Sequence, residues 1–273
     1  MVARIFTSIL RISPKVRKCL WKWWYQRLAK RGQATGWAFM NYGYTPLNGS
    51  SPKLDLEEKD ENDRHFIQLY HHAASAVPIE NKNVLEVGSG RGGGTSFVAR
   101  YHSPAEMTGL DFSPTAISLS QKMHGDIPNL TFVHGDAEKL PFEDHNFDTV
   151  INVESSHCYG NMDAFVKEVS RVLKPGGYFS WVDLRGTDMI QALEVALSHP
   201  QLQLVRNEII TENVIQALDE IHERKIDLIR EYIPKWIQPA FKDFAGVKNS
   251  KIYNAFKDGS AIYLAKAYQK TRH

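Results

Sequence analysis

The segment NVESSHCYG, residues 152–160, places two proton-accepting side chains three residues apart, Glu154 and His157. An unperturbed histidine has a pKa near neutrality, so His157 is a candidate catalytic base that removes a proton from a reacting hydroxyl. Glu154 is the second candidate. The alternatives are that His157 only fixes the loop and that Glu154 bonds backbone or ligand, and the sequence leaves them open.

A glycine-rich segment, VLEVGSGRGGG at residues 84–94, has the spacing of a loop that binds a nucleotide. Gly88, Gly90 and Gly93 satisfy the pattern G-x-G-x-x-G, in which glycine lets the backbone turn sharply and approach a ligand closely. Asp111 follows Gly90 by 21 residues. A carboxylate at that spacing accepts hydrogen bonds from both hydroxyls of an adenosine ribose. A tight turn without a ligand is the alternative, but five glycines among seven residues favour binding.

A parallel sheet would bring the glycine loop, Asp111 and the 152–160 segment together at the carboxyl ends of its strands. Short β-rich runs alternate with helical patterns over residues 61–184, which predicts an α/β fold with a doubly wound, Rossmann-like sheet. We expect strands at residues 83–87, 106–110, 130–134, 147–153 and 178–183, with helices over 95–101, from Ser113-Pro114, and over 162–173. Residues 250–256 and 261–267 flank Lys257-Asp258-Gly259, a hairpin signal. The expected sheet is therefore seven-stranded and mostly parallel, with an antiparallel C-terminal hairpin.

Three later motifs distinguish between the kinds of nucleotide site. Gly135-Asp136-Ala137 closes the third strand, PFEDHNFDTV (residues 141–150) leads into the fourth, and LKPGG (residues 173–177) precedes the fifth. In this order the motifs resemble the class I S-adenosylmethionine (SAM)-dependent methyltransferases, over about residues 61–184 and again at the C-terminal hairpin. The resemblance implies that SAM is the cofactor and S-adenosylhomocysteine the product.

The same resemblance assigns the residues that hold the cofactor. Glu86 and the 88–94 loop would hold the methionine part, Asp111 the ribose, and Asp136 with Ala137 the edge of the adenine. The full set is Glu86, Gly88, Ser89, Gly90, Gly92, Asp111, Phe112, Asp136, Ala137 and Asn152. SAM carries the activated methyl carbon, so the protein mainly aligns the acceptor with that carbon and excludes water.

Residues 33–60 form a segment rich in Gly, Asn, Pro and Ser with interleaved aromatic side chains. Aromatic faces attract a sulfonium cation and exclude water, so Trp37, Tyr42 and Tyr44, together with Phe39, are expected to form a lid. Packing of these side chains on the core is the alternative. Tyr159 and Asp183 are expected to border the substrate, unless Tyr159 packs on the next helix and Asp183 only ends its strand.

Residues 1–32 hold nine Lys/Arg and no acidic side chain, whereas the remaining residues hold 24 basic and 31 acidic side chains. A basic, aromatic, amphipathic helix is typical of an interfacial anchor, so residues 1–31 are expected to contact a membrane from the cytoplasm. An organellar import signal and an ordinary packed helix are the alternatives.

The net acidic charge of residues 33–273 argues against nucleic acid as a partner. Two cysteines without ligand spacing argue against a metal site and fit a reducing compartment.

The predicted organisation has three parts: a basic N-terminal helix at 1–32, an aromatic arm at 33–60, and a methyltransferase domain at 61–273. A helical cap is expected at about residues 185–249 and, with the arm, should form the acceptor pocket. Its apolar stripe at helical spacing is expected to pack on the domain and consists of Ile210, Val214, Leu218, Ile221, Leu228 and Tyr232.

Three short blocks carry a closer resemblance: GWAFMNYGY (residues 36–44), NVESSHCY (152–159) and YFSWVDLR (178–185). They resemble the mycobacterial phthiotriolone/phenolphthiotriolone dimycocerosate methyltransferases, although Gly160 stands where proline is expected in that group. That group methylates an oxygen on a long-chain lipid. The resemblance implies an oxygen acceptor, a hydroxyl or enolisable ketone, on an apolar, lipid-like or polyketide molecule.

Other functions remain open at this point. The chain could methylate carbon or nitrogen of a sterol, a quinone or another small molecule. A nicotinamide-dependent oxidoreductase would use the same glycine loop, although it leaves Gly135-Asp136-Ala137 and LKPGG without explanation. A non-catalytic membrane scaffold would bind SAM without turnover. The sequence gives no indication of the oligomeric state.

Overall fold

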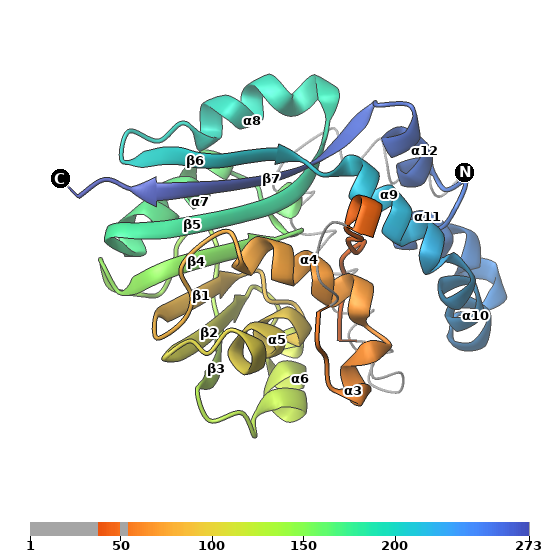
Figure 1. The fold of residues 1–273 in the computed structure, drawn as a ribbon, viewed down its shortest axis with the longest axis horizontal. Helices are drawn as coiled ribbons and strands as arrows, with labels where there is room; N and C mark the ends of the chain where they lie inside the picture. Colours follow the sequence, from red (N-terminus) through yellow and green to blue (C-terminus); the bar gives the residue numbers. More distant parts are fainter. Residues whose placement is uncertain (1–37, 50–53, 273) are drawn as a thin grey trace.

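A seven-stranded sheet forms the centre of the protein, for which a computed structural model describes residues 38–49 and 54–272 (Figure 1). The strand order is β3-β2-β1-β4-β5-β7-β6, and β1 to β5 run parallel. The strands are β1 (Asn83–Val87), β2 (Glu106–Asp111), β3 (Leu130–His134), β4 (Phe147–Val153), β5 (Leu173–Gly186), β6 (Leu202–Ile209) and β7 (Ala261–Lys270). The predicted fold class and the five parallel strands are confirmed.

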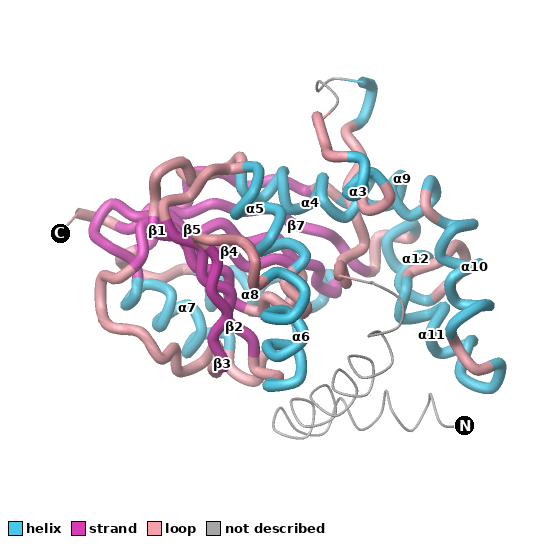
Figure 2. Tube along the Cα trace, turned by 90° about the horizontal axis from the view of Figure 1, so that it is seen from below, coloured by secondary structure: helices cyan, strands magenta, loops and turns pink. Residues whose placement is uncertain are grey.

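Both faces of the sheet are covered, as expected for parallel strands with continuous apolar runs. Neighbouring residues of one strand enter different cores: Val84 packs with α4 (Arg64–Ala74) and α5 (Gly93–Tyr101), whereas Leu85 packs with α7 (Met162–Val172) and α8 (Ile190–Leu197). Figure 2 shows α4 and α5 on one side of the strands and α7 on the other. The sheet is therefore the rigid middle layer that holds the loops at its edge.

The helix α6 (Pro114–His124) begins as the sequence predicts. Ser113 is its N-cap, and its side-chain oxygen accepts a hydrogen bond from the backbone N–H of Ala116. Pro114 occupies the first helical position, where its missing N–H costs no hydrogen bond. This start fixes the loop that follows β2.

The predicted C-terminal hairpin is wrong in its first strand. Residues 251–257 form the helix α12 (Lys251–Lys257), because Ser250 caps it by accepting a hydrogen bond from the N–H of Tyr253. Gly259, with a φ of 76°, ends this helix rather than making a hairpin turn. The strand β7 instead lies between β5 and β6 and is antiparallel to both.

The segment expected as a helical cap, about residues 185–249, is only partly helical. It begins with the end of β5 and contains the whole of β6. The helices α9 (Thr211–Glu220), α10 (His222–Tyr232) and α11 (Gln238–Ala245), with α12, form what we call the helical extension, which lies at one end of the molecule (Figure 1). Of the predicted stripe, Val214 and Leu218 are fully buried, but Tyr232 is exposed.

Shorter elements complete the described chain. They are η2 (Leu47–Gly49), α3 (Glu58–Glu61), η3 (Ser156–Cys158), η4 (Thr187–Met189) and η5 (Lys235–Ile237). The predicted N-terminal helix, residues 1–32, and Trp37 of the predicted lid lie outside the described residues. Over residues 38–49 and 54–272, none of the helices has the length and apolar character to cross a bilayer.

Candidate active site

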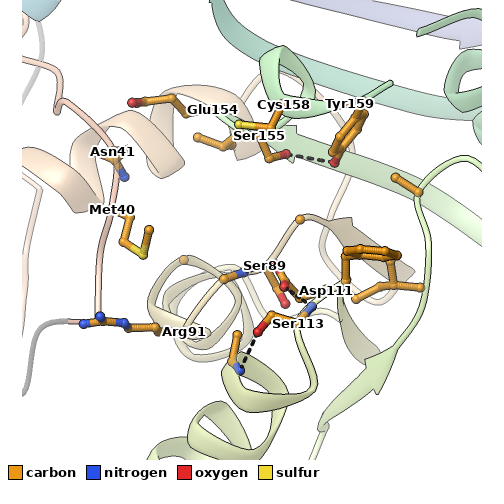
Figure 3. Close-up of a pocket in the computed structure, with 18 of the residues that line it drawn as sticks. Met40, Asn41, Ser89, Arg91, Asp111, Ser113, Glu154, Ser155, Cys158 and Tyr159 are labelled. Atoms are coloured by element: carbon orange, nitrogen blue, oxygen red, sulfur yellow. Dashed lines mark hydrogen bonds between the residues drawn. The ribbon is translucent and has the colours of Figure 1, made fainter. Parts of the chain in front are cut away.

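A cavity lies at the carboxyl ends of β1, β2 and β4, where the strand order changes direction (Figure 3). Ligands of doubly wound sheets bind at such a switch point because the loops from neighbouring strands diverge there. The lining comes from six places along the chain: residues 38–41, Tyr70 in α4, the glycine loop, the β2–α6 turn, residues 136–138 after β3 and the segment after β4. The predicted residues Gly88, Ser89, Gly90, Asp111, Phe112, Asp136, Ala137, Glu154 and Tyr159 all line it.

The glycine loop is held tightly against the end of β2. The backbone N–H groups of Gly88 and Ser89 both donate to the carbonyl of Leu110, at 2.7 and 2.9 Å. Gly88 has a φ of 84°, and a Cβ placed on it would lie 2.3 Å from Oγ of Ser155. A Cβ on Gly90 would meet no atom within 4 Å. The first glycine is thus required by the fold, while the second leaves open space beside the loop.

Asp111 is at the end of β2, with its carboxylate inside the cavity wall. One oxygen accepts a hydrogen bond from the N–H of Ser113 at 2.8 Å, and the other from Gly90 at 2.9 Å. Burial raises the pKa of Asp111 to about 6. Each carboxylate oxygen can accept two hydrogen bonds, and each accepts only one of these two backbone bonds. Both oxygens therefore retain a lone pair for a ligand hydroxyl.

Ser89 and Arg91 supply polar groups to the same loop, and the sequence prediction included Arg91 only as a member of the 88–94 loop. Both line the cavity and are 4% and 3% exposed, respectively. The hydroxyl oxygen of Ser89 is buried without a hydrogen-bond partner among the residues that the structure describes. Burial lowers the pKa of Arg91 to about 10, so its guanidinium is charged at neutral pH. A buried cation and an unsatisfied hydroxyl in the loop that leads into α5 both suit an anionic group.

Glu154 follows β4 in a left-handed conformation, with a φ of 47°, which is strained for a glutamate. Its Oε2 atom accepts two hydrogen bonds, from the N–H of Tyr42 at 2.8 Å and from the hydroxyl of Tyr263 at 2.5 Å. Within the described chain, no hydrogen bond to Oε1 is present. Burial raises the pKa of Glu154 to about 7. The carboxylate is therefore fixed through one oxygen and exchanges a proton near neutral pH.

His157 does not line the cavity, whereas its neighbour Cys158 does. Its Nδ1 atom lies 2.8 Å from Asp183, a fully buried carboxylate at the end of β5. Burial opposes the charged form, but Cys158 and Asp183 together hold the pKa of His157 well above its usual value. Despite its burial, the pKa of Asp183 is held far below the usual range by His157 and Arg185. The structure thus shows an ion pair between a partly buried histidine and a fully buried carboxylate, outside the cavity lining.

The predicted aromatic lid is not present at Tyr42 and Tyr44. The ring of Tyr42 packs edge-on against Phe256, and Tyr44 stacks on His72 with ring centroids 4.5 Å apart. Phe39 lines the cavity but is itself buried. The arm approaches the loop so closely that a Cβ on Gly93 would lie 2.8 Å from the carbonyl oxygen of Ala38. Residues 38–41 form one wall of the cavity, and Tyr42 and Tyr44 anchor the arm to the core.

Three predicted cofactor residues lie behind the wall and support it. The carboxylate of Glu86 accepts hydrogen bonds from the hydroxyls of Tyr70, at 2.8 Å, and Thr95, at 2.5 Å. Asn152 donates to the carbonyl of Val87 and to Ser155. Gly92, with a φ of 79°, is the N-cap of α5. These residues shape the loop and do not line the cavity.

Several lining residues were not named individually in the sequence prediction, although Arg91 and Gly94 belong to the predicted 88–94 loop. They are Ala38, Met40, Asn41, Tyr70, Arg91, Gly94, Leu110, Ser113, Ala116, Glu138, Val153, Ser155 and Cys158. The sequence contains a signal for Arg91, because this arginine is the single charged residue of the 88–94 loop. Glu138 had none: its carboxylate accepts a hydrogen bond from the N–H of Gly160 at 2.8 Å, a contact that a proline at position 160 could not make.

Comparison with protein families matches residues 85–181 to a methyltransferase domain. The chain is 36% identical over 253 residues to a phthiotriol/phenolphthiotriol dimycocerosates methyltransferase of Mycobacterium leprae, covering 93% of both chains. It is 39% identical over 236 residues to a fatty-acid O-methyltransferase of Mycolicibacterium smegmatis, covering 86% of this chain and 83% of that protein.

Among solved structures, the fold is similar to a geranyl diphosphate C-methyltransferase of Streptomyces coelicolor, in complex with Mg²⁺, geranyl diphosphate and S-adenosylhomocysteine. The TM-score is 0.66 at 14% identity, with 93% of this chain and 98% of that chain covered. At this identity the likeness concerns the fold alone. The chain-long identity to the two mycobacterial proteins is the stronger comparison.

Proposed function

The chain belongs to the methyltransferase family of the phthiotriol/phenolphthiotriol dimycocerosates methyltransferases, and we propose that it methylates a hydroxyl oxygen of an apolar, lipid-like acceptor. It is a SAM-dependent enzyme with a Rossmann-like fold. The observation that carries the proposed acceptor chemistry is Glu154, whose carboxylate is fixed through Oε2 in the wall of the cavity.

The residues of the cavity fit SAM on three observations. Asp111 has acceptor capacity for two ribose hydroxyls, and Gly90 leaves open space beside the loop. The buried hydroxyl of Ser89 and the guanidinium of Arg91 match the α-carboxylate of the methionine part. When bound, SAM supplies a methyl carbon activated by its sulfonium sulfur. Phe112, Asp136 and Ala137 would border the adenine.

We assign the role of general base to Glu154. A carboxyl with a pKa of about 7 is partly ionised at neutral pH, so it can accept the proton that the acceptor hydroxyl loses. Tyr263 and the N–H of Tyr42 keep the carboxylate oriented, and Oε1 is the oxygen that would take the proton. His157 is less suited to this role, because Asp183 favours its protonated form and an imidazolium accepts no proton. We therefore give His157 and Asp183 the role of positioning the 154–159 segment.

The lining beside Glu154 favours an uncharged, apolar acceptor. Ala38, Phe39, Met40 and Val153 present apolar side chains to the same cavity. An acceptor carboxylate would meet the partial negative charge of Glu154, which raises the cost of binding a fatty acid. An alcohol avoids this repulsion and supplies the proton that Glu154 takes.

The test compares matched long-chain acceptors with SAM labelled at its methyl carbon. A long-chain secondary alcohol, the corresponding ketone and the corresponding carboxylic acid are each incubated with the full chain, and the products are separated by mass spectrometry. An O-methyl ether from the alcohol supports the proposal. A methyl ester as the main product, or a C- or N-methyl product from a sterol, quinone or amine, would overturn it. SAM binding without turnover on any of them would favour a scaffold.

We further propose that residues 1–31 contact a membrane surface, with import into an organelle as the alternative. The support is the excess of nine Lys/Arg without acidic residues in 1–32. Deletion of this segment should leave SAM binding intact and reduce the association with liposomes. Full liposome binding after the deletion would exclude the anchor.

A further inference from the structure

The end of the helical extension exposes aromatic side chains to solvent. Trp236, in η5, is 78% exposed and is the most exposed large apolar side chain of residues 38–49 and 54–272. Tyr232, at the end of α10, is 43% exposed. Both belong to residues 230–242, which comprise the end of α10, the short helix η5 and the start of α11. We call this segment the aromatic tip. An exposed tryptophan costs hydration free energy, so its position calls for an explanation.

The exposure of Trp236 and Tyr232 does not arise from poor packing of the helices that carry them. The inner faces of α10 and α11 form their own apolar cluster, which includes Ile229, Phe241 and Ala245. The buried ammonium of Lys225 donates a hydrogen bond of 2.8 Å to the carbonyl of Ala245 and so ties the two helices together. The helices are packed, and Trp236 and Tyr232 remain outside the packing.

The charge around these rings differs from that of the rest of the protein. The aromatic tip contains Arg230, Lys235 and Lys242 against a single acidic residue, Glu231. Arg230 forms an ion pair of 3.2 Å with Asp227, so Lys235 and Lys242 are the basic side chains that carry the electrostatic argument. Residues 33–273 as a whole hold 24 basic and 31 acidic side chains, and are therefore net acidic. An anionic surface would repel most of this body and attract the tip. Tryptophan and tyrosine favour the headgroup layer of a bilayer, where lysine and arginine pair with lipid phosphates.

We propose that the aromatic tip docks on an anionic lipid bilayer, with Trp236 inserted among the headgroups and Lys235 paired with lipid phosphate. This site is separate from residues 1–31 and does not depend on the identity of the methyl acceptor. The helix α11, in which the tip ends, contacts the arm beside the cavity. The hydroxyl of Tyr42 donates to the carbonyl of Phe244 in α11, at 3.2 Å, and the N–H of Tyr42 holds Glu154.

The experiment measures flotation of the full chain with two kinds of vesicle, phosphatidylcholine alone and phosphatidylcholine mixed with phosphatidylglycerol. Trp236→Ser is expected to weaken binding to the mixed vesicles by about tenfold, since one interfacial aromatic side chain is lost. Lys235→Glu should weaken binding to the mixed vesicles only. The matched control is Val195→Ser, which removes a 71% exposed apolar side chain from α8 and should leave flotation unchanged.

Several results would overturn the proposal. They are the absence of vesicle binding by the wild-type chain, flotation of Trp236→Ser equal to that of the wild type, and an equal loss in Val195→Ser. A concentration-dependent dimer that Trp236→Ser abolishes, without a change in flotation, would assign the tip to self-association instead. Turnover on the long-chain secondary alcohol, supplied without vesicles, is measured in parallel for the wild type and Trp236→Ser. Because Trp236 lies outside the cavity, the substitution should not change this turnover. Absence of turnover by the wild type would count against the proposed function alone.

Discussion

The hydroxyl of Tyr263 lies 2.5 Å from Oε2 of Glu154, and this contact links the antiparallel strand β7 to the end of the parallel strand β4. The side chain of Tyr263 is fully buried, and that of Glu154 is partly buried. The last strand of the sheet therefore orients the carboxylate that we assign as the base. This linkage makes the acid–base behaviour of the site testable at two positions that are 109 residues apart.

Glu154→Gln should lower kcat by about 10²–10⁴, because the amide cannot accept the proton of the acceptor hydroxyl. The affinity for S-adenosylhomocysteine, measured by calorimetry, should remain close to that of the wild type. His157→Gln serves as the comparison and should cost less turnover, because its imidazole lies behind Cys158 and outside the cavity lining. A larger loss in His157→Gln than in Glu154→Gln would move the role of base to His157.

Tyr263→Phe should shift the pH–rate profile. The hydroxyl of Tyr263 stabilises the ionised form of Glu154, so its removal raises the pKa of that carboxyl above about 7. A base is active when deprotonated, and the rise of kcat with pH should therefore move to higher pH, by on the order of one pH unit. The measurement is kcat from pH 5 to pH 9 for both enzymes. An unchanged profile would mean that Glu154 does not control the rate.

Asp111→Asn should weaken the binding of S-adenosylhomocysteine by about tenfold to a hundredfold, because charged hydrogen bonds to the ribose are lost. For the wild type, affinity should fall as the pH drops through about 6, where Asp111 takes up a proton. Asp126→Asn, at an exposed site in the turn after α6, is the matched control and should bind normally. Equal affinities of Asp111→Asn and the control would remove Asp111 from the ribose site.

Gly88→Ala and Gly90→Ala should separate the two roles of the glycine loop. At Gly88 the added methyl would lie 2.3 Å from Ser155, so the variant should lose about 2–4 kcal/mol of stability. At Gly90 the methyl meets no atom within 4 Å, and only the left-handed backbone costs about 1–2 kcal/mol. Gly90→Ala should instead weaken cofactor binding through the space it fills. Thermal unfolding and calorimetry of both variants check this contrast, and equal Tm values would contradict it.

The sequence was sufficient for the elements whose signals are local. The five parallel strands are short apolar runs between turn residues, and Ser113-Pro114 starts α6 through contacts within four residues. The strand β6 was assigned to the helical cap because it lies at the sheet edge, and Leu204, Val205 and Ile209 point to solvent there. The pairing of β7 with β5 and β6 joins distant segments, so no local pattern could indicate it.

The same distinction applies to the site. The spacing of the glycines, and the distance in sequence from Gly90 to Asp111, were sufficient to predict the residues beside the cofactor. Each of these residues is positioned by one strand and the turn that follows it. The roles of Glu154 and His157 depend on partners far along the chain. Tyr263 orients the first, and Asp183, which is 26 residues away, stabilises the protonated form of the second. Sequence reasoning therefore ranked His157 first, while the geometry favours Glu154.

The pair of His157 and Asp183 gives a prediction about stability. The side chain of Asp183 is fully buried, accepts a hydrogen bond of 2.6 Å from Ser156 and forms an ion pair of 3.1 Å with Arg185. Asp183→Asn leaves the buried Arg185 and the partly buried His157 without their counter-charge, and should destabilise the fold by about 3–5 kcal/mol. His157→Gln removes only one partner and should cost less.

The pH dependence of that effect has a defined sign. The pKa of Asp183 is lowered in the fold, so its stabilisation is present above its unfolded pKa of about 4 and is lost as pH falls through the folded value. The pKa of His157 is raised, so its stabilisation is complete below about pH 6.5 and is lost as pH rises through the folded value. The Tm difference between wild type and His157→Gln should therefore be largest near pH 5–6 and shrink at alkaline pH. A Tm difference that stays constant from pH 5 to pH 9 would show that His157 is neutral throughout, and would restore it as a candidate base.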